Sequence, residues 1–224
     1  MKRSSRERPD GESVSELTTA RLSVYLRSLE SLEAAGINTV SSRGLAEQFR
    51  LNAAQIRKDL AHFGEFGVRG VGYYVKDLRR HLREILGLDR QLKVVIIGAG
   101  NLGLALADYP GFRHDGFDVV ALLDTARDKV GQYSRSGVPI RHARELERLS
   151  ERERLDIAVL AVPAESAQEV VDAVVGAGVK AILNFTPGSL RVPKGVKLKN
   201  VDLTVSLESL SFFLARGVDV PEVS

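Results

Sequence analysis

The stretch at residues 93–108 constrains the fold of this chain more than any other part. A mostly β-branched run, KVVII, leads into the sequence GAGNLG at 98–103, and a helical pattern of small residues follows. In such a turn Gly98 permits a sharp bend, Gly100 lets a pyrophosphate approach the backbone, and Gly103 lets the helix pack closely on the strand. The stretch therefore predicts a strand, a glycine turn and a helix whose N-terminus faces the phosphates of a dinucleotide.

The residues around and after this turn alternate between short apolar runs and helical patterns. This alternation predicts an α/β fold with a Rossmann-like, doubly wound parallel sheet and right-handed crossovers. We expect strands at 93–97, 117–123, 138–140, 157–162, 179–185 and 196–201, and helices at 102–108, 143–152 and 164–176. A last helix at 204–216 follows the sheet, and we expect its apolar side to contact a partner subunit.

Asp124 lies about 20 residues after the glycine turn, where an acidic residue binds the ribose hydroxyls of NAD(H). Its charge favours NAD(H) over NADP(H), although Arg127 and Lys129 lie nearby. The carboxyl ends of the other strands should complete the site. The expected cofactor-binding residues are Gly98, Ala99, Gly100, Asn101, Leu102, Gly103, Tyr109, Asp124, Lys129, Val162, Pro163, Asn184 and Phe185.

A hydride-transfer enzyme would need an acid–base group beside the nicotinamide. His114 and His142 are expected in loops or at helix starts, and no predicted strand ends in Lys, Cys or His. Tyr109 without a lysine partner is a weak candidate for catalysis. An apolar pocket would nevertheless distinguish the cationic oxidised nicotinamide from the neutral reduced form. We therefore expect a protein that is not an enzyme, has no catalytic residues, and binds NADH and NAD⁺ as regulatory ligands.

The first half of the chain has helical periodicity. An amphipathic helix is predicted to end near Gly36, a second to begin at Ser41 and Ser42, and a third to span 53–63. Two short helices joined by a tight turn form the helix-turn-helix pattern. Small, amide and basic side chains on the exposed side of the third helix suit base edges and phosphates. These residues are Ala54, Gln55, Arg57, Lys58 and His62.

The segment at 64–74 carries several glycines around a single arginine, Arg69. It predicts a small β-wing whose tip presents this arginine to a groove or a phosphate, with a plain hairpin as the alternative. A fourth helix at 75–86 follows. Residues 1–86 are mildly basic and the remainder is nearly neutral, which suits a polyanionic partner for the first half.

Composition sets the remaining limits. The chain has 224 residues, a formal net charge of +3 and no cysteine, which excludes disulfides, thiolate metal sites and cysteine catalysis. No apolar run approaches the roughly 20 residues of a membrane helix, and the charged N-terminus does not resemble a secretory signal. We expect a cytoplasmic protein without a metal site. Its expected parts are a flexible arm at 1–17, a winged-helix DNA-binding domain at 18–86, an NAD(H)-binding domain at 87–203, and a dimerisation helix and tail at 204–224.

These motifs resemble the Rex family of redox-sensing transcriptional repressors. The match is carried by SS at 41–42, RKDL at 57–60, HFG at 62–64, RGVGY at 69–73, the glycine turn, DYP at 108–110, KVG at 129–131, NF at 184–185 and VD at 201–202. The resemblance covers residues 18–214, and it implies a homodimer that swaps its C-terminal helices. It also implies that the dimer binds a palindromic double-stranded DNA operator until NADH binds. The residues expected at DNA are Ser41, Ser42, Arg43, Gln55, Arg57, Lys58, Arg69, Gly70, Gly72 and Tyr73.

The resemblance also implies a switch made of Arg27, Tyr109 and Asp202. One departure from the family concerns the residue after that aspartate, which is often aromatic and is Leu203 here. A weaker stacking contact there would lower NADH affinity or redox discrimination. Two alternatives stay open: an NAD-dependent oxidoreductase with a fused winged helix, and a CoA- or nucleotide-binding module used for assembly.

Overall fold

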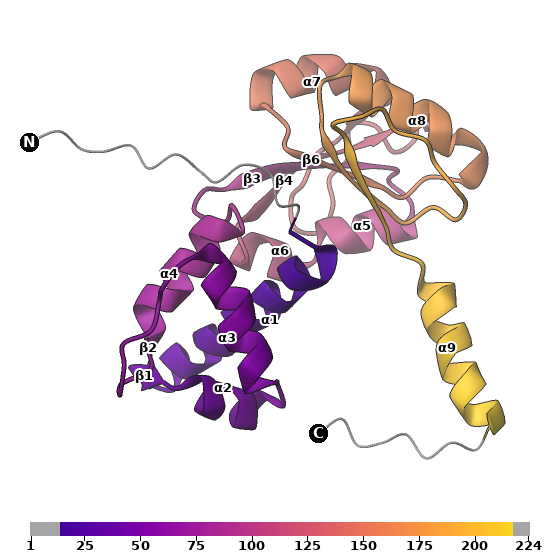
Figure 1. Cartoon of the computed structure of the whole chain (residues 1–224). Coiled ribbons are helices and arrows are strands. Elements are labelled where there is room, and N and C mark those ends of the chain that lie inside the picture. The colour runs from indigo at the N-terminus through magenta and orange to yellow at the C-terminus, as the bar shows by residue number, and fades with distance from the viewer. Residues whose placement is uncertain (1–13, 217–224) are drawn as a thin grey trace, which may run out of the picture. The chain divides into compact units, whose positions relative to one another are not determined.

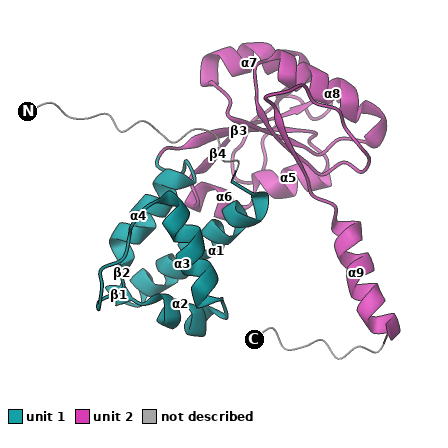
Figure 2. Ribbon diagram, in the orientation of Figure 1, with its two compact units in different colours: residues 1–89, 221–224 teal, residues 90–220 magenta. Residues whose placement is uncertain are grey.

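The computed structural model describes residues 14–216. Most of the arm expected at 1–17, and the end of the tail expected at 204–224, lie outside these residues. The described chain divides into two compact units, with the boundary between Asp89 and Arg90 (Figure 2). We describe each unit separately.

The first unit contains four helices and a two-stranded sheet in the described residues (Figure 1). Side chains of Ser15, Ser41 and Asn52 accept hydrogen bonds from the first turns of the first three helices, so each begins at a polar cap. The elements are α1 (Glu16–Ala34), β1 (Thr39–Val40), α2 (Ser42–Phe49), α3 (Ala53–Phe63), β2 (Tyr73–Tyr74) and α4 (Val75–Ile85).

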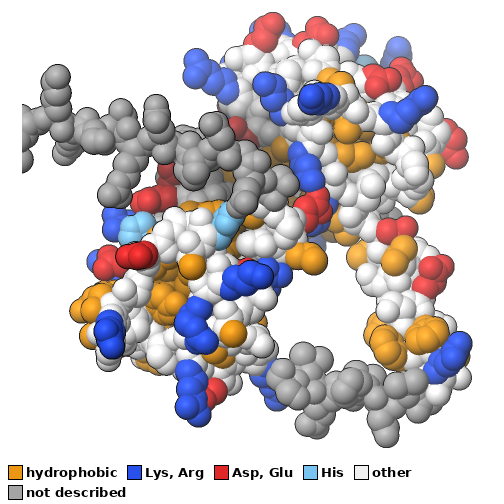
Figure 3. Space-filling model, viewed as in Figure 1, with side chains coloured by type: hydrophobic (Ala, Val, Ile, Leu, Met, Phe, Trp, Pro, Cys, Tyr) orange, Lys and Arg blue, Asp and Glu red, His pale blue; other side chains and the backbone are white. Residues whose placement is uncertain are grey.

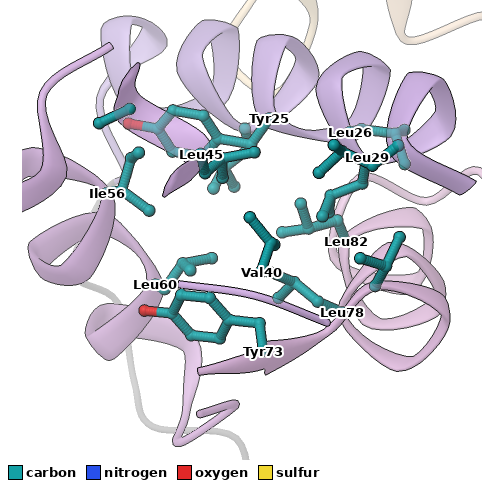
Figure 4. Packing of buried hydrophobic residues seen from close by; sticks show 14 residues of the cluster. Tyr25, Leu26, Leu29, Val40, Leu45, Ile56, Leu60, Tyr73, Leu78 and Leu82 are labelled. Atoms are coloured by element: carbon teal, nitrogen blue, oxygen red, sulfur yellow. The ribbon is translucent and has the colours of Figure 1, made fainter. Parts of the chain in front are cut away.

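One apolar core joins these elements (Figure 4). Tyr25 and Leu29 of α1, Leu45 of α2, Ile56 of α3 and Leu82 of α4 are almost completely buried. Their spacing within each helix places them on one face, as the sequence predicts. This packing fixes α3 against α1 and so determines which side of α3 remains exposed.

The segment at 64–74 forms a small wing with little backbone pairing of its own. Its tip is closed by a single bridge between Val68 and Gly72, and β2 pairs with β1 in antiparallel register. Gly72 has a φ of 96°, and an added Cβ would lie 3.0 Å from the Cα of Ser41. The base of the wing is therefore held directly against the start of α2.

The second unit is the predicted Rossmann-like fold. Within the described residues its sheet has six strands, all parallel, in the order β5-β4-β3-β6-β7-β8. The chain builds the sheet outward in one direction from β3 to β5 and in the other from β6 to β8, so the strand order switches between β3 and β6. Helices α7 and α8 cover one face of the sheet and α5 covers the other (Figure 1). The elements are β3 (Leu92–Ile97), α5 (Asn101–Ala107), α6 (Pro110–His114), β4 (Phe117–Asp124), β5 (Ile140–His142), the 3-10 turn η1 (Ala143–Glu145), α7 (Leu146–Glu153), β6 (Ile157–Leu160), α8 (Ala164–Gly176), β7 (Ala181–Asn184), β8 (Lys197–Asn200) and α9 (Leu203–Arg216).

The sequence analysis misplaced one strand of this unit and missed one short helix. The strand expected at 138–140 is β5, Ile140–His142, and the short helix α6 was not expected. Pro139 has no N–H to donate, but its carbonyl accepts from the backbone N–H of Leu122. The pairing of β5 with β4 therefore begins with Ile140 opposite Leu122.

The last helix, α9, is exposed along its whole length. Its apolar side chains include Leu207, Leu210 and Phe213, and Figure 3 shows apolar groups at the surface over this helix. Among the described residues, no helix is both long and apolar enough to cross a membrane.

Candidate functional site

The glycine turn lies between the end of β3 and the start of α5. Gly98 has a φ of 104°, and a Cβ there would collide with the carbonyl oxygen of Ala161. A Cβ on Gly103 would collide with the carbonyl oxygen of Gly98, whereas a Cβ on Gly100 would meet no atom within 4 Å. Two glycines therefore serve close packing, and the third leaves space open in front of the helix N-terminus.

A cleft of about 710 Å³ opens beside this turn, at the carboxyl ends of β3 and β6. This is the point where the strand order reverses, which is where ligands bind in open parallel sheets. The cleft is large enough for part of a dinucleotide. Its lining includes Gly98, Gly100, Asn101, Leu102, Asp124, Lys129, Val162, Pro163, Ser166, Glu169, Val170 and Ala173.

Asp124 is held firmly at the rim of this cleft. Its Oδ2 accepts hydrogen bonds from the backbone N–H of Ala99 at 2.8 Å and from Nζ of Lys129 at 3.2 Å, and its Oδ1 accepts from the N–H of Ala126 at 2.8 Å. Burial opposes ionisation, but the two backbone N–H groups and the lysine together hold the pKa of Asp124 below its ordinary value. The carboxylate is therefore charged, oriented and able to accept further hydrogen bonds.

Several predicted cofactor residues lie elsewhere. Ala99 and Gly103 are buried under the turn, and Tyr109 lines a separate, smaller cavity at 107–119. Asn184 is fully buried and donates to the carbonyl of Thr186 and to Oδ1 of Asn200, while Phe185 packs on the core. These two residues stabilise the chain after β7 and do not line the cleft.

The sequence analysis missed the contribution of α8. Ser166, Glu169, Val170 and Ala173 lie on the side of α8 that lines the cleft. Their spacing of three and four residues is the available signal, because it puts them on one helical face directly after β6.

His142 was also placed incorrectly. It ends β5 beside Asp124 of β4, so one strand does end in a histidine. Its Nδ1 accepts a hydrogen bond from the backbone N–H of Arg144 and thereby caps the following turn. This role explains the residue without acid–base chemistry.

The predicted DNA-facing residues that precede the wing lie at the start of α2 and on α3. Oγ of Ser41 caps α2, and Nη1 of Arg57 donates to Oγ of Ser42 at 2.9 Å. Arg43 is exposed and pairs with Glu47, and Lys58 is exposed with no side-chain partner in the described chain. Figure 3 shows basic side chains gathered over α2 and α3.

The wing contributes Arg69 at an exposed tip, next to Gly70 with a φ of 82°. Tyr73, by contrast, belongs to the core, and burial raises its pKa. Tyr73 was expected at DNA, but its side chain packs in the core. Its backbone pairs with Val40, which helps to hold the wing on β1.

The three residues of the implied switch are all exposed. Arg27 lies on α1 of the first unit, and Tyr109, which is 57% exposed, precedes α6 of the second. Oδ1 of Asp202 accepts from the backbone N–H of Thr204 at 2.8 Å and so caps α9. Leu203, the departure from the family pattern, is the exposed first residue of that helix.

Two family models match the chain, one in each unit. Residues 13–61 match the model described as a putative DNA-binding protein N-terminus. Residues 89–188 match the model described as a CoA binding domain.

Full-length relatives are more decisive. The redox-sensing transcriptional repressor Rex of Desulfitobacterium hafniense is 48% identical over 199 residues, covering 89% of this chain and 94% of the relative. The Rex protein of Thermus thermophilus is 48% identical, covering 89% and 93%. The chain belongs to the Rex family. Because Rex proteins are named as transcriptional repressors, the expectation of a regulator and not an enzyme is confirmed.

Solved Rex-family structures agree with this assignment. The structure of RSP in complex with β-NAD⁺ and operator DNA is similar with a TM-score of 0.87 and 40% identity, covering 92% of this chain and 95% of that chain. RSP in complex with β-NADH is similar with a TM-score of 0.81 and 39% identity, covering 92% and 97%. The predicted combination of a winged helix and a Rossmann-like domain is confirmed.

Proposed function

We propose that this chain is a repressor that binds a palindromic DNA operator and is released when NADH binds. The observation that carries the proposal is the presence of both sites in a member of the Rex family: a charged, preformed dinucleotide cleft and an exposed recognition helix. Such a repressor acts in the cytoplasm, where bacterial DNA is accessible.

The cleft has the features that a dinucleotide requires. The open space over Gly100 admits the pyrophosphate to the N-terminus of α5, and Asp124 accepts hydrogen bonds from ribose hydroxyls. Val162 and Pro163 supply apolar surface, which opposes the positive charge of oxidised nicotinamide and favours the neutral reduced ring. The site thus binds the two redox forms with different affinities and needs no catalytic group.

At DNA, α3 is proposed to enter the major groove. Arg57 and Lys58 provide positive charge, and Arg69 at the wing tip reaches the flanking backbone or minor groove. The hydrogen bond from Arg57 to Ser42 joins α3 to the start of α2, so both helices present their polar groups to the same stretch of phosphates.

The two sites are proposed to communicate through a homodimer. A swapped α9 would bury the apolar residues that this helix exposes, and Arg27, Tyr109 and Asp202 would form the contacts that change with NADH. An affinity ratio of about 100 between two dimer geometries corresponds to roughly 2.7 kcal/mol of coupling free energy.

A titration tests this function directly. The full chain is equilibrated with a pool of randomised palindromic duplexes, the bound sequence is recovered, and its affinity is measured with NADH and with NAD⁺. We expect NADH to weaken the complex by about 100-fold and NAD⁺ to weaken it far less. A complex that persists at saturating NADH contradicts the proposal, as does turnover of NADH with carbonyl substrates.

Asp124→Ala tests the nucleotide site. Removing the carboxylate takes hydrogen bonds from the ribose and relieves repulsion of a 2′-phosphate, so NADH affinity should fall by about tenfold while NADPH affinity falls less or rises. Fluorescence titration of both nucleotides measures the change. Asp128→Ala removes an exposed carboxylate from the same loop and should alter neither affinity. An unchanged preference in Asp124→Ala would exclude Asp124 from the ribose site.

A further inference from the structure

Asp59 is a buried carboxylate on the proposed recognition helix. Its side chain is 4% exposed, although it lies in the same helix as the exposed Arg57 and Lys58. Oδ2 accepts hydrogen bonds from Nε of Arg21 at 2.6 Å and from the hydroxyl of Tyr25 at 2.9 Å. Oδ1 accepts from Nη2 of Arg21 at 2.8 Å and from Nε2 of Gln55 at 2.8 Å. Four donors therefore occupy the four acceptor positions of one carboxylate.

This carboxylate is ionised. The hydrogen bonds from Arg21 are the largest influence, and together with those from Gln55 and Tyr25 they outweigh burial and hold the pKa of Asp59 below its ordinary value. An ionised carboxylate only accepts hydrogen bonds. Every group that contacts Asp59 must therefore turn a donor toward it.

That requirement fixes the orientation of the Gln55 side-chain amide. Gln55 must point its NH₂ group at Asp59, because its carbonyl oxygen would be repelled by the carboxylate. Within the described chain, Oε1 of Gln55 accepts no hydrogen bond. Gln55 is only half-buried, lies in the first turn of α3 and neighbours the exposed Ala54 and Lys58 on the helix surface. Its free oxygen is thus available at the end of α3 that approaches base edges.

We propose that Asp59 is a positioning residue that makes Gln55 present a hydrogen-bond acceptor to DNA, so that Gln55 selects a base with an exocyclic amino group. The inference deepens the proposed function and rests on it. In the major groove only adenine N6 and cytosine N4 are donors, whereas guanine and thymine present acceptors at the corresponding positions. Adenine suits Gln55 best, because the second N–H of the amide can donate to N7 while Oε1 accepts from N6.

The test compares base preferences of the full chain at every position of its bound duplex. We expect Gln55→Ala to lose a preference of about tenfold for adenine or cytosine at one position of each half-site, with other positions unchanged. Wild-type protein should show the same loss when that adenine is replaced by purine, or that cytosine by 2-pyrimidinone, because both replacements remove the amino group and leave the base opposite its normal partner.

Asp59→Asn tests the positioning role. The introduced amide can donate a hydrogen bond to Gln55, which lets the Gln55 amide turn and present its NH₂ group instead. The preference at that one position should therefore be lost or move toward guanine or thymine, and adding Gln55→Ala should abolish any new preference, so that the double variant matches Gln55→Ala there. Arg21→Lys is the matched control: it weakens the link between α1 and α3 but keeps the carboxylate, so it should lower affinity for all sequences and leave the preference intact.

The outcomes separate the two proposals. If circular dichroism shows that Asp59→Asn is folded, and its base preferences equal those of the wild type, the positioning role is wrong. If Asp59→Asn does not fold, the Gln55→Ala and base-replacement experiments decide, and unchanged preferences in both overturn the inference. If NADH does not release the wild-type protein from DNA, the proposed function is wrong. The base preferences of the variants still decide whether Gln55 selects a base. A wild-type chain that binds no duplex contradicts both.

Discussion

Gly103→Ala is expected to unfold at a markedly lower temperature than the wild type and to lose NADH binding. A Cβ at this position would overlap the carbonyl oxygen of Gly98. Gly98 cannot move away easily, because its backbone already lies so close to the carbonyl of Ala161, just after β6, that not even a Cβ would fit between them. Both obstacles are backbone atoms, so we expect a loss of about 3 kcal/mol in the free energy of unfolding.

Gly100→Ala is the matched control for this prediction. Its φ of −80° suits alanine and no atom lies within 4 Å of the new Cβ, so stability should change by less than about 0.5 kcal/mol. The added methyl group would nevertheless occupy space that the pyrophosphate needs, and NADH affinity should fall. Thermal unfolding and fluorescence titration of both variants separate packing from binding. Normal stability in Gly103→Ala would show that the turn relaxes more easily than its geometry implies.

The helices of the first unit and the glycine turn were predictable because their signals are local. Caps at Ser41 and Asn52 and the apolar spacing of α3 determine where the helices begin and which side is buried. The wing was less predictable, because β2 pairs with β1 more than thirty residues earlier in the chain. No pattern within 64–74 indicates that partner.

The cleft was predicted in position but only partly in composition. Strand ends converge at one edge of a parallel sheet, which correctly places Asp124, Val162 and Pro163 together. The same rule wrongly adds Asn184, because β7 is one strand further from the switch point and its last side chain turns into the protein. Strand order and side-chain direction come from tertiary packing, which the linear pattern does not contain.

Asp59 shows the same limit at the DNA-facing unit. Within the sequence RKDL, Asp59 resembles any polar residue on the surface of a helix. Nothing near it indicates burial, because its partner Arg21 lies 38 residues earlier in the chain. The structure instead makes it the centre of the contact between α1 and α3. A buried ion pair of this kind is costly to break, because removing one partner leaves the other without compensation.

Asp59→Ala should therefore destabilise the first unit by about 3 kcal/mol at neutral pH. The variant leaves the guanidinium of Arg21, the buried hydroxyl of Tyr25 and the amide of Gln55 without their acceptor. Denaturant unfolding of the full chain, followed by circular dichroism, measures the change. Asp77→Ala is the control, because Asp77 is an exposed carboxylate of the same unit and forms an exposed ion pair with Arg80 at 3.9 Å. It should change stability by less than about 0.5 kcal/mol.

The dependence on pH distinguishes an ion pair from a packing defect. The folded-state pKa of Asp59 is lowered, first by the hydrogen bonds from Arg21, so the carboxylate contributes stability that is fully present above its unfolded pKa of about 3.9. That contribution is lost as the pH falls through the lower folded-state pKa. The stability difference between wild type and Asp59→Ala should therefore be constant from pH 7 to about pH 5 and shrink below about pH 4. A difference that stays the same down to pH 2 would mean that Asp59 stabilises α3 by its shape, and that its charge does not hold the helix in place.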